Sequence, residues 1–161
     1  MIPILLSILS YDVWFYVSHR MLHWRSMYNS IHAIHHSKSR PKFLDAYTGH
    51  WFEGPFQSLG TVVLMFFITY SFYDIACILL FLNARGMMRH DDRFTWLLGN
   101  HHLLHHLYPN YNYGEYWLDW LGGTLYPHRD EAKSGLLPLF LESRKRLQDL
   151  NPPQTNSELP F

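Results

Sequence analysis

Histidines gather in three short clusters whose spacing matches the turn of a helix. Residues three and four positions apart lie on one helical face, so the rings of each cluster are expected to converge on one side. One cluster is an i, i+4 pair and two repeat the pattern H-x-x-H-H; the members are His19 and His23, then His32, His35 and His36, then His102, His105 and His106. Neutral imidazole suits zinc, copper, iron and nickel, whereas magnesium and calcium prefer oxygen ligands. The clusters therefore predict a transition-metal site.

The number of rings indicates how many ions the site holds. One zinc ion takes three or four protein ligands, whereas the three clusters offer eight imidazoles, so we expect two metal ions. His90 follows the long apolar region and is a further candidate ligand, with an ordinary surface histidine as the alternative. His101 lies about 100° from its neighbour on a helix and is left out of the ligand set. His50 and His128 are expected in solvated loops.

Each cluster taken alone also fits a role without a metal. The pair His19 and His23 fits a helix end at a membrane interface, where protonated imidazole favours the C-terminal dipole. Either H-x-x-H-H motif alone fits a pH-sensing patch. Two such motifs together disfavour that interpretation, because several adjacent protonated histidines would repel one another.

Carboxylates are expected beside the ligands, because a metal-binding histidine usually donates its second N–H to a carboxylate or a carbonyl. Asp12 lies seven residues before His19, two turns down the same face, in an apolar segment where an unpaired carboxylate is costly. Asp12 and Asp119 are the candidate supporting acids, and an unrelated interior contact is the alternative for Asp12. Asp119, Glu53 and Asp92 are weaker candidates than Asp12, each with a surface salt bridge as the default.

Composition excludes several classes of protein. Lys plus Arg and Asp plus Glu number 13 each, so no net charge favours nucleic acid as a partner. The only cysteine, Cys77, excludes an internal disulfide and a cysteine-based zinc site. Aromatic residues make up 17% of the chain, slightly more than the charged residues, as is typical of a protein at a bilayer boundary. The length of 161 residues fits one domain, expected over residues 1–150, with a loose tail over 151–161.

Two apolar regions would position the histidines. Residues 2–17 predict one helix that runs into His19; the alternative, a secretory signal, lacks a basic start and a cleavage site. Residues 57–84 contain a single charged residue, Asp74, and fit one long tilted helix or two shorter helices with a break near Ser71. Arginines and lysines on both sides favour two cytoplasmic flanks, hence a hairpin over residues 55–88. A buried hairpin of a soluble protein is the alternative. We expect an all-α integral membrane helical bundle with a cytoplasmic histidine-rich metal-binding cap.

Four features of the sequence resemble the fatty acid hydroxylase superfamily, which contains sterol desaturases, sterol methyl oxidases, and sphingolipid and carotenoid hydroxylases. They are D-x-W-F-Y-x-x-H-R-x-x-H from Asp12 to His23, the two H-x-x-H-H motifs, and Asn112-Tyr113-Gly114 followed by Asp119 and Gly123-Thr124. Their order and spacing extend over about three quarters of the chain. Members usually carry Trp and Phe where this chain has Leu118 and Gly122, and a further transmembrane pair before the first motif.

The resemblance implies a helical membrane protein whose cytoplasmic cap holds two irons on eight or more histidines. The irons would react with O₂ and with electrons from a separate carrier. By position, the eight clustered histidines are similar to the family's ligands, and His90 to an additional histidine that members place between the hairpin and the last motif. Zinc is expected to replace iron in some purified samples.

The first functional hypothesis is therefore an O₂-dependent di-iron oxidoreductase that hydroxylates or desaturates a C–H bond of a lipid. A separate reductase or electron-transfer protein is expected, because the chain has no glycine-rich dinucleotide fingerprint. The expected location is the endoplasmic reticulum in a eukaryote or the inner membrane in a bacterium. A membrane zinc hydrolase and a non-enzymatic metal-binding membrane protein are the alternatives. Aromatic residues are candidates for the lining of the substrate passage, with interface anchoring or an ordinary core position as the alternative for each; they are Trp51, Phe52, Tyr108, Tyr111, Tyr113, Tyr116 and Trp117.

Overall fold

The computed structural model describes residues 2–128, 130–133 and 135–136, and every regular element in these residues is a helix. The α-helices are α1 (Ile2–Leu22), α2 (Arg25–Ser30), α3 (Glu53–Leu64), α4 (Phe72–Arg89), α5 (Thr95–Leu98), α6 (His101–Leu107) and α7 (Tyr116–Leu121). The 3-10 helices are η1 (His32–Ser37), η2 (Phe43–Tyr47) and η3 (Asp92–Phe94). The expected all-α architecture is confirmed for these residues, whereas the tail predicted over residues 151–161 lies outside them.

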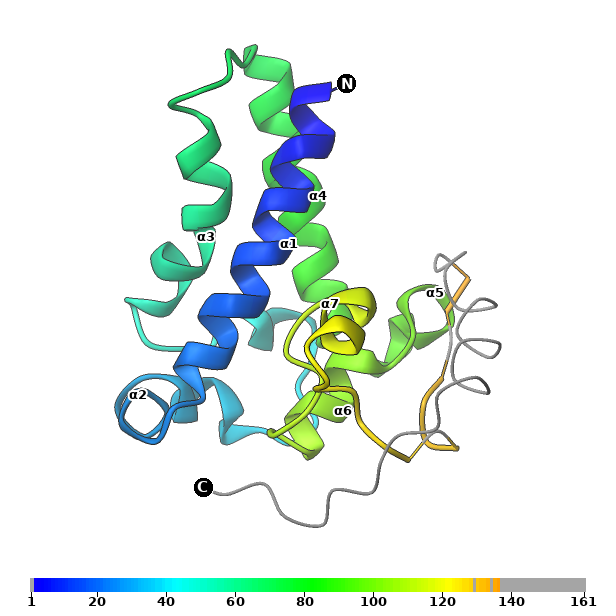
Figure 1. Cartoon of the computed structure of the whole chain (residues 1–161). Coiled ribbons are helices and arrows are strands. Elements are labelled where there is room, and N and C mark those ends of the chain that lie inside the picture. Colours follow the sequence, from blue (N-terminus) through cyan, green and yellow to red (C-terminus); the bar gives the residue numbers. More distant parts are fainter. Residues whose placement is uncertain (1, 129, 134, 137–161) are drawn as a thin grey trace.

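The three longest helices stand side by side as an upright bundle, with α1 packed against both α3 and α4 (Figure 1). Close contact between α1 and α3 depends on Gly60, because a Cβ atom there would lie 2.5 Å from the Cβ of Trp14. The Trp14 indole also donates a hydrogen bond of 2.7 Å to the carbonyl of Phe56. At the far end, the hydroxyls of Ser7 and Tyr70 are hydrogen-bonded at 2.7 Å. These contacts fix α3 along α1.

The apolar region after Glu53 is broken, as one of the two sequence interpretations required. α3 ends at Leu64 and α4 begins at Phe72, and the chain reverses between them (Figure 1). Ser71 caps α4 by accepting a hydrogen bond from the N–H of Asp74, whose side chain in turn accepts one from the N–H of Ser71. With a rise of 1.5 Å per residue, α3 extends roughly 18 Å and α4 roughly 27 Å.

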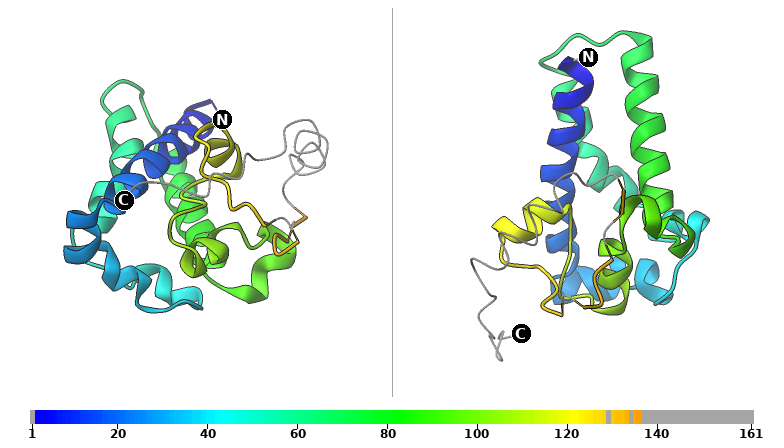
Figure 2. Two further views of the ribbon diagram at one scale, coloured as in Figure 1. Left: turned by 60° about the horizontal axis from the view of Figure 1, so that its bottom comes forward. Right: turned by 90° about the vertical axis from the view of Figure 1, so that its right-hand side faces the viewer.

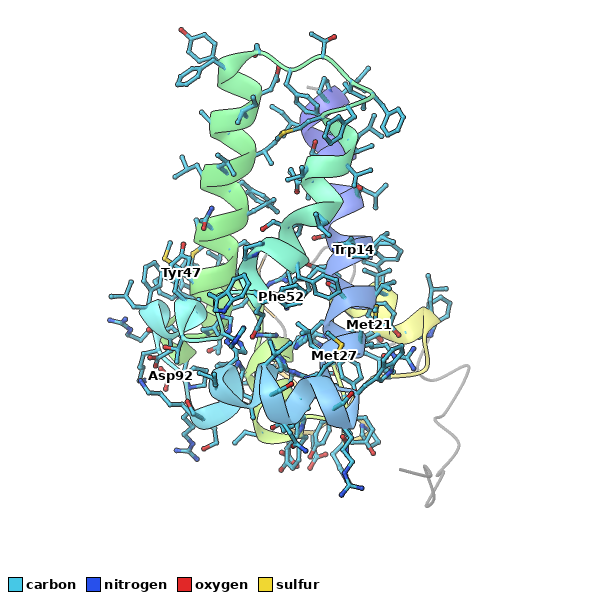
Figure 3. All side chains as sticks on the ribbon, turned by 90° about the vertical axis from the view of Figure 1, so that its left-hand side faces the viewer. Trp14, Met21, Met27, Tyr47, Phe52 and Asp92 are labelled. Atoms are coloured by element: carbon cyan, nitrogen blue, oxygen red, sulfur yellow. The ribbon has the colours of Figure 1, made fainter. Side chains whose placement is uncertain are left out.

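Burial in this fold is inverted relative to a water-soluble bundle. Large apolar side chains on α1, α3 and α4 are exposed; they include Ile2, Leu5, Leu9, Val63, Phe72, Leu80 and Phe81. Figure 3 shows mostly carbon atoms around the upper part of the bundle, with nitrogen and oxygen concentrated at its lower end. Among the described helices, α1 is long and apolar enough to cross a bilayer.

The short helices α2, α5, α6, η1, η2 and η3 surround the lower end of the bundle and form a cap (Figure 2). The lower ends of α1 and α4 reach this cap (Figure 2), and α7, later in the chain, packs against α1. Tyr16 of α1 packs with Tyr113 and Leu118 in the small apolar core beside α7. The cap is where the histidine clusters meet.

Candidate metal centre

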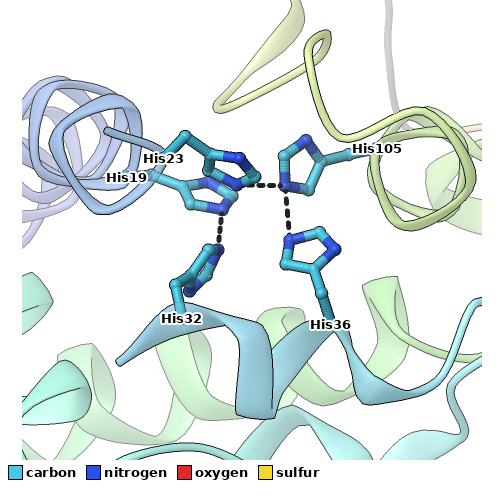
Figure 4. Close-up of side chains that lie close together, drawn as sticks. All are labelled: His19, His23, His32, His36 and His105. Carbon is cyan, nitrogen blue, oxygen red and sulfur yellow. Dashed lines mark hydrogen bonds between the residues drawn. The ribbon is translucent and has the colours of Figure 1, made fainter. Parts of the chain in front are cut away.

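Five histidines from three separate elements meet beneath the bundle. α1 contributes His19, the turn directly after α1 contributes His23, η1 contributes His32 and His36, and α6 contributes His105. One ring nitrogen from each lies within 4.8 Å of the others, and the rings face a common centre (Figure 4). The Nε2 atoms of His19 and His32 are 2.9 Å apart, and those of His36 and His105 are 3.0 Å apart. We call this set the five-histidine group.

A second set lies directly beside the first. It comprises His35 from η1, His90 from the end of α4, and His102 and His106 from α6, all of them buried. Their ring nitrogens also lie within 4.8 Å of one another. The Nε2 atom of His90 is 3.1 Å from that of His35 and 3.0 Å from that of His102. We call this set the four-histidine group, and the two groups together contain every histidine that the sequence proposed as a ligand.

Each H-x-x-H-H motif is divided between the two groups. Residues 32–37 form a 3-10 helix, in which side chains three apart eclipse each other. The rings of His32 and His35 are accordingly stacked, with centroids 5.3 Å apart, and belong to different groups. In α6, His105 belongs to the five-histidine group, whereas His102 and His106 belong to the four-histidine group. The rings of His36 and His106, one from each group, are 4.7 Å apart, so the shared motifs hold two adjacent centres.

In five of the nine rings, the nitrogen that faces away from the centres is held by an oxygen acceptor. Five Nδ1 atoms donate to an oxygen: His19 to the carbonyl of Tyr113 (2.5 Å), His105 to that of Tyr111 (2.6 Å), His90 to that of Gly86 (2.7 Å), His35 to that of Thr48 (2.9 Å), and His32 to the Glu53 carboxylate (2.9 Å). A neutral imidazole carries one N–H, so a proton held at Nδ1 leaves Nε2 with a bare lone pair. This is the arrangement of metal-binding histidines.

In each of two histidine pairs, the Nε2 lone pairs therefore face each other with no proton between them. In the pair His19 and His32, both Nδ1 atoms donate elsewhere and the two Nε2 atoms are 2.9 Å apart. In the pair His35 and His90 the same is true at 3.1 Å. Such contacts are not hydrogen bonds and would be repulsive alone. A cation bound between the nitrogens removes the repulsion, and each group contains one such pair.

His106 gives separate support for a bound ion. Its ring is 4% exposed, and neither ring nitrogen has a hydrogen-bond partner among the described residues. A buried polar group without a partner is unfavourable. Because the ring lies within the four-histidine group, an ion at that centre would supply the missing interaction.

Burial in the cap lowers the pKa of several of the grouped histidines. Burial, and then the positive charge that neighbouring histidines would carry, lowers the pKa of His23 and of His36 to about 2. The same two causes lower the pKa of His90 to about 3 and lower the pKa of His102 and His106. At neutral pH these rings are therefore neutral and available as ligands.

Glu53, a weaker candidate in the sequence, makes the carboxylate contact expected of a supporting acid. It stands at the first position of α3, is 6% exposed, and accepts from the buried His32. Asp92, the other weaker candidate, forms an exposed salt bridge with Lys42, which was its default interpretation.

Asp119 supports the centre through the backbone. This fully buried carboxylate accepts hydrogen bonds from the N–H groups of Tyr113 (2.8 Å) and Gly114 (2.9 Å). It thereby fixes the loop whose Tyr113 carbonyl accepts from His19. The carboxylate of Asp119 also lies 2.9 Å from Nε2 of His101, the histidine that the sequence analysis left out of the ligand set. Among the described residues, Asp119 forms no hydrogen bond to any of the nine grouped rings.

Asp12 was predicted to support a metal-binding histidine, and its observed partner corrects that prediction. Its carboxylate pairs with Arg85 of α4 rather than with a histidine. Arg85 also contacts Glu115 at 3.1 Å, and Arg89 forms a further ion pair with Glu115. Burial raises the pKa of Glu115, but the charges of Arg89 and Arg85 outweigh it and lower that pKa to about 2. This network joins α1, α4 and the segment before α7, and so positions the lower ends of the helices that carry ligands.

Comparison with known proteins gives the family. The sequence model of the fatty acid hydroxylase family matches residues 4–124, which contain every histidine of both groups. The chain belongs to the fatty acid hydroxylase family. No solved structure matches this family member significantly.

Similar curated proteins are sterol desaturases. The Delta(7)-sterol 5(6)-desaturase of Candida glabrata is 30% identical over 123 residues, which cover 70% of this chain and 33% of that protein. The corresponding enzyme of Candida dubliniensis is 31% identical over 152 residues, covering 88% of this chain and 37% of that protein. The Delta(7)-sterol-C5(6)-desaturase of Nicotiana tabacum is 30% identical over 130 residues, covering 73% and 48%. The chain therefore spans about a third to a half of the length of these relatives.

A cavity of about 250 Å³ in this fatty acid hydroxylase family member leads from the bundle to the histidines. α1, α3 and α4 supply most of its wall, and His19, His35, His90 and His102 lie at its lower end. Apolar residues along the described wall include Phe15, Val62, Met65, Leu79 and Leu82. The seven aromatic residues expected along the passage do not line this cavity, so that expectation is not met there. Two of them instead use backbone carbonyls to hold histidines.

Proposed function

We propose that this chain is the metal-binding core of an O₂-dependent di-iron oxidoreductase that hydroxylates or desaturates a C–H bond of a lipid. The observation that carries the proposal is the pair of facing lone pairs in each histidine group, His19 with His32 and His35 with His90. Membership of the fatty acid hydroxylase family supports the lipid as the substrate class.

The donor set fits iron better than tetrahedral zinc. One group offers five donors, one more than tetrahedral zinc accepts. Imidazole suits iron, and bound iron would supply the redox and O₂ chemistry.

The chain's own residues hold and orient these donors. Carbonyls and the Glu53 carboxylate keep protons at Nδ1, so that Nε2 remains free to bind. Phe15 lines the cavity and packs against His19, with ring centroids 5.1 Å apart, and its apolar ring would limit the access of water to the histidines. A lipid lying in the cavity would present its C–H bonds to the centre at His35, His90 and His102.

We also propose that the bundle is embedded in a membrane with its cap on the cytoplasmic side. The apolar exteriors of α1, α3 and α4 support the first part, because exposed apolar surface of this extent is unfavourable in water. Basic residues flanking the apolar helices, among them Arg20, Arg25, Lys38, Arg40 and Arg93, support the second. A lipid would then reach the cavity from the bilayer.

The sterol desaturases among the relatives favour a sterol, or a lipid of similar shape, as the substrate. Electrons would come from a separate carrier, as in the sequence hypothesis. The identity of the substrate and of the carrier are parts of this proposal that an activity measurement decides.

Expression in a lipid-producing host, followed by mass spectrometry of the host lipids, tests the proposal. The wild type is expected to generate an oxygenated or more unsaturated lipid, and His105→Ala is expected to abolish it. His128→Ala is the matched control, because this exposed histidine lies outside both groups. Unchanged lipids with folded wild type would contradict the proposal, and O₂-independent turnover of a zinc-loaded chain would favour the hydrolase instead.

A further inference from the structure

Two glycines line the metal end of the cavity. Gly54 lies on α3 beside Glu53, which holds His32. Gly86 lies on α4, and its carbonyl accepts the hydrogen bond from His90. A Cβ atom built at either position meets no described atom within 4 Å. Gly54 is exposed and Gly86 is half-buried, and each leaves open space in the wall among side chains such as Glu53, Arg85 and Arg89.

Neither glycine is required by the fold in the described residues. Other glycines have a visible reason: Gly60, Gly114, Gly122 and Gly135 allow close contacts, and Gly99 and Gly123 have positive φ angles. Gly54 and Gly86 have neither a close neighbour nor a positive φ. Glycine inside a helix is unfavourable relative to alanine. The feature that these two positions retain is the open space itself.

Aromatic side chains line the side of the cavity formed by α1. Tyr11 and Phe15 lie there, and their rings are stacked with centroids 5.6 Å apart and an angle of 24° between their planes. Aromatic rings pack well against hydrocarbon. We call the space between these two rings and the open positions at Gly54 and Gly86 the slot.

We propose that Gly54 and Gly86 are specificity-determining residues that keep this slot wide enough for the fused rings of a lipid. The inference rests on the proposed function, since it takes the cavity as the lipid site. A side chain at either position narrows the slot at its metal end. A single extended acyl chain is thinner than a fused-ring system and still fits.

Binding measurements on the full chain in detergent test this inference without requiring turnover. The probes are dehydroergosterol, a fluorescent sterol, and parinaric acid, a fluorescent straight-chain fatty acid. Gly86→Leu and Gly54→Leu are each expected to weaken sterol binding by at least about tenfold, the scale of an added group in an apolar pocket, and to leave parinaric acid binding within about threefold. Ala76→Leu is the control, because Ala76 is exposed on α4 and does not line the cavity.

Gly86→Ala and Gly54→Ala guard against misfolding of the larger variants. Both alanine variants are expected to melt at or above the wild-type temperature, because the helices favour alanine, while sterol binding still weakens. Equal losses for both probes, no loss for either, or a wild type that binds no sterol would overturn the inference. A wild type that binds the sterol selectively but modifies no lipid would contradict the proposed function alone.

Discussion

Replacing Glu53 by alanine is expected to weaken metal binding at one centre and to leave the other unchanged. Glu53 is the carboxylate that accepts from Nδ1 of His32, at 2.9 Å, with both side chains buried. Without it, the ring of His32 loses the acceptor that fixes its tautomer and orientation. Removing such a partner typically lowers metal affinity by about 10–100-fold, or about 1.4–2.7 kcal/mol. Because His32 belongs to the five-histidine group, only that group should weaken.

Anaerobic titration with ferrous iron against a competing chelator measures the effect. Wild type should show two binding events, and Glu53→Ala should shift one of them by the factor above. Glu53→Gln should stay close to wild type, because the amide carbonyl can still accept from His32. Asp92→Asn removes an exposed carboxylate that pairs with Lys42 and serves as the control. Unchanged affinity in the alanine variant, or equal weakening of both events, would refute the role assigned to Glu53.

Three further perturbations test the fold that positions the site. Metal-free protein should lose stability as the pH falls from about 6.5 toward 3, because the pKa of His90 is about 3 in the folded state and near 6.5 in the unfolded state. Denaturant unfolding at a series of pH values measures this loss. A free energy of unfolding that is constant over this range would contradict the prediction. Asp12→Ala should destabilise by about 3–5 kcal/mol, since it leaves the buried Arg85 without this partner, as thermal melting would show; a loss below about 1 kcal/mol would count against burial of the pair. Gly60→Ala should lower the melting temperature, because its Cβ would overlap Trp14, and a rise would argue against close packing of α1 and α3.

The sequence was sufficient to choose the histidines but not to assign them to centres. Spacing of three and four residues identifies rings that share a helical face. It does not reveal that η1 is a 3-10 helix, in which the ring of His35 stacks on that of His32 while its Nε2 atom meets that of His90 in the other group. His90 was itself ambiguous, because its partners are brought to it only when α4 packs over η1 and α6.

The supporting contacts were harder to predict because most of them carry no sequence signal. Four of the five Nδ1 acceptors described are backbone carbonyls, which any residue type supplies. Asp12 shares a helical face with His19, yet a stronger partner, Arg85, arrives from 73 positions away. The cavity wall depends in the same way on how α3 and α4 flank α1.

Iron stoichiometry is the most direct test of the two-centre account. Metal-depleted full-length chain would be titrated anaerobically with ferrous iron and its metal content determined by mass spectrometry after removal of excess iron. The arrangement of the two histidine groups predicts two iron ions per chain. Saturation at one ion or none, with the protein folded, would contradict it.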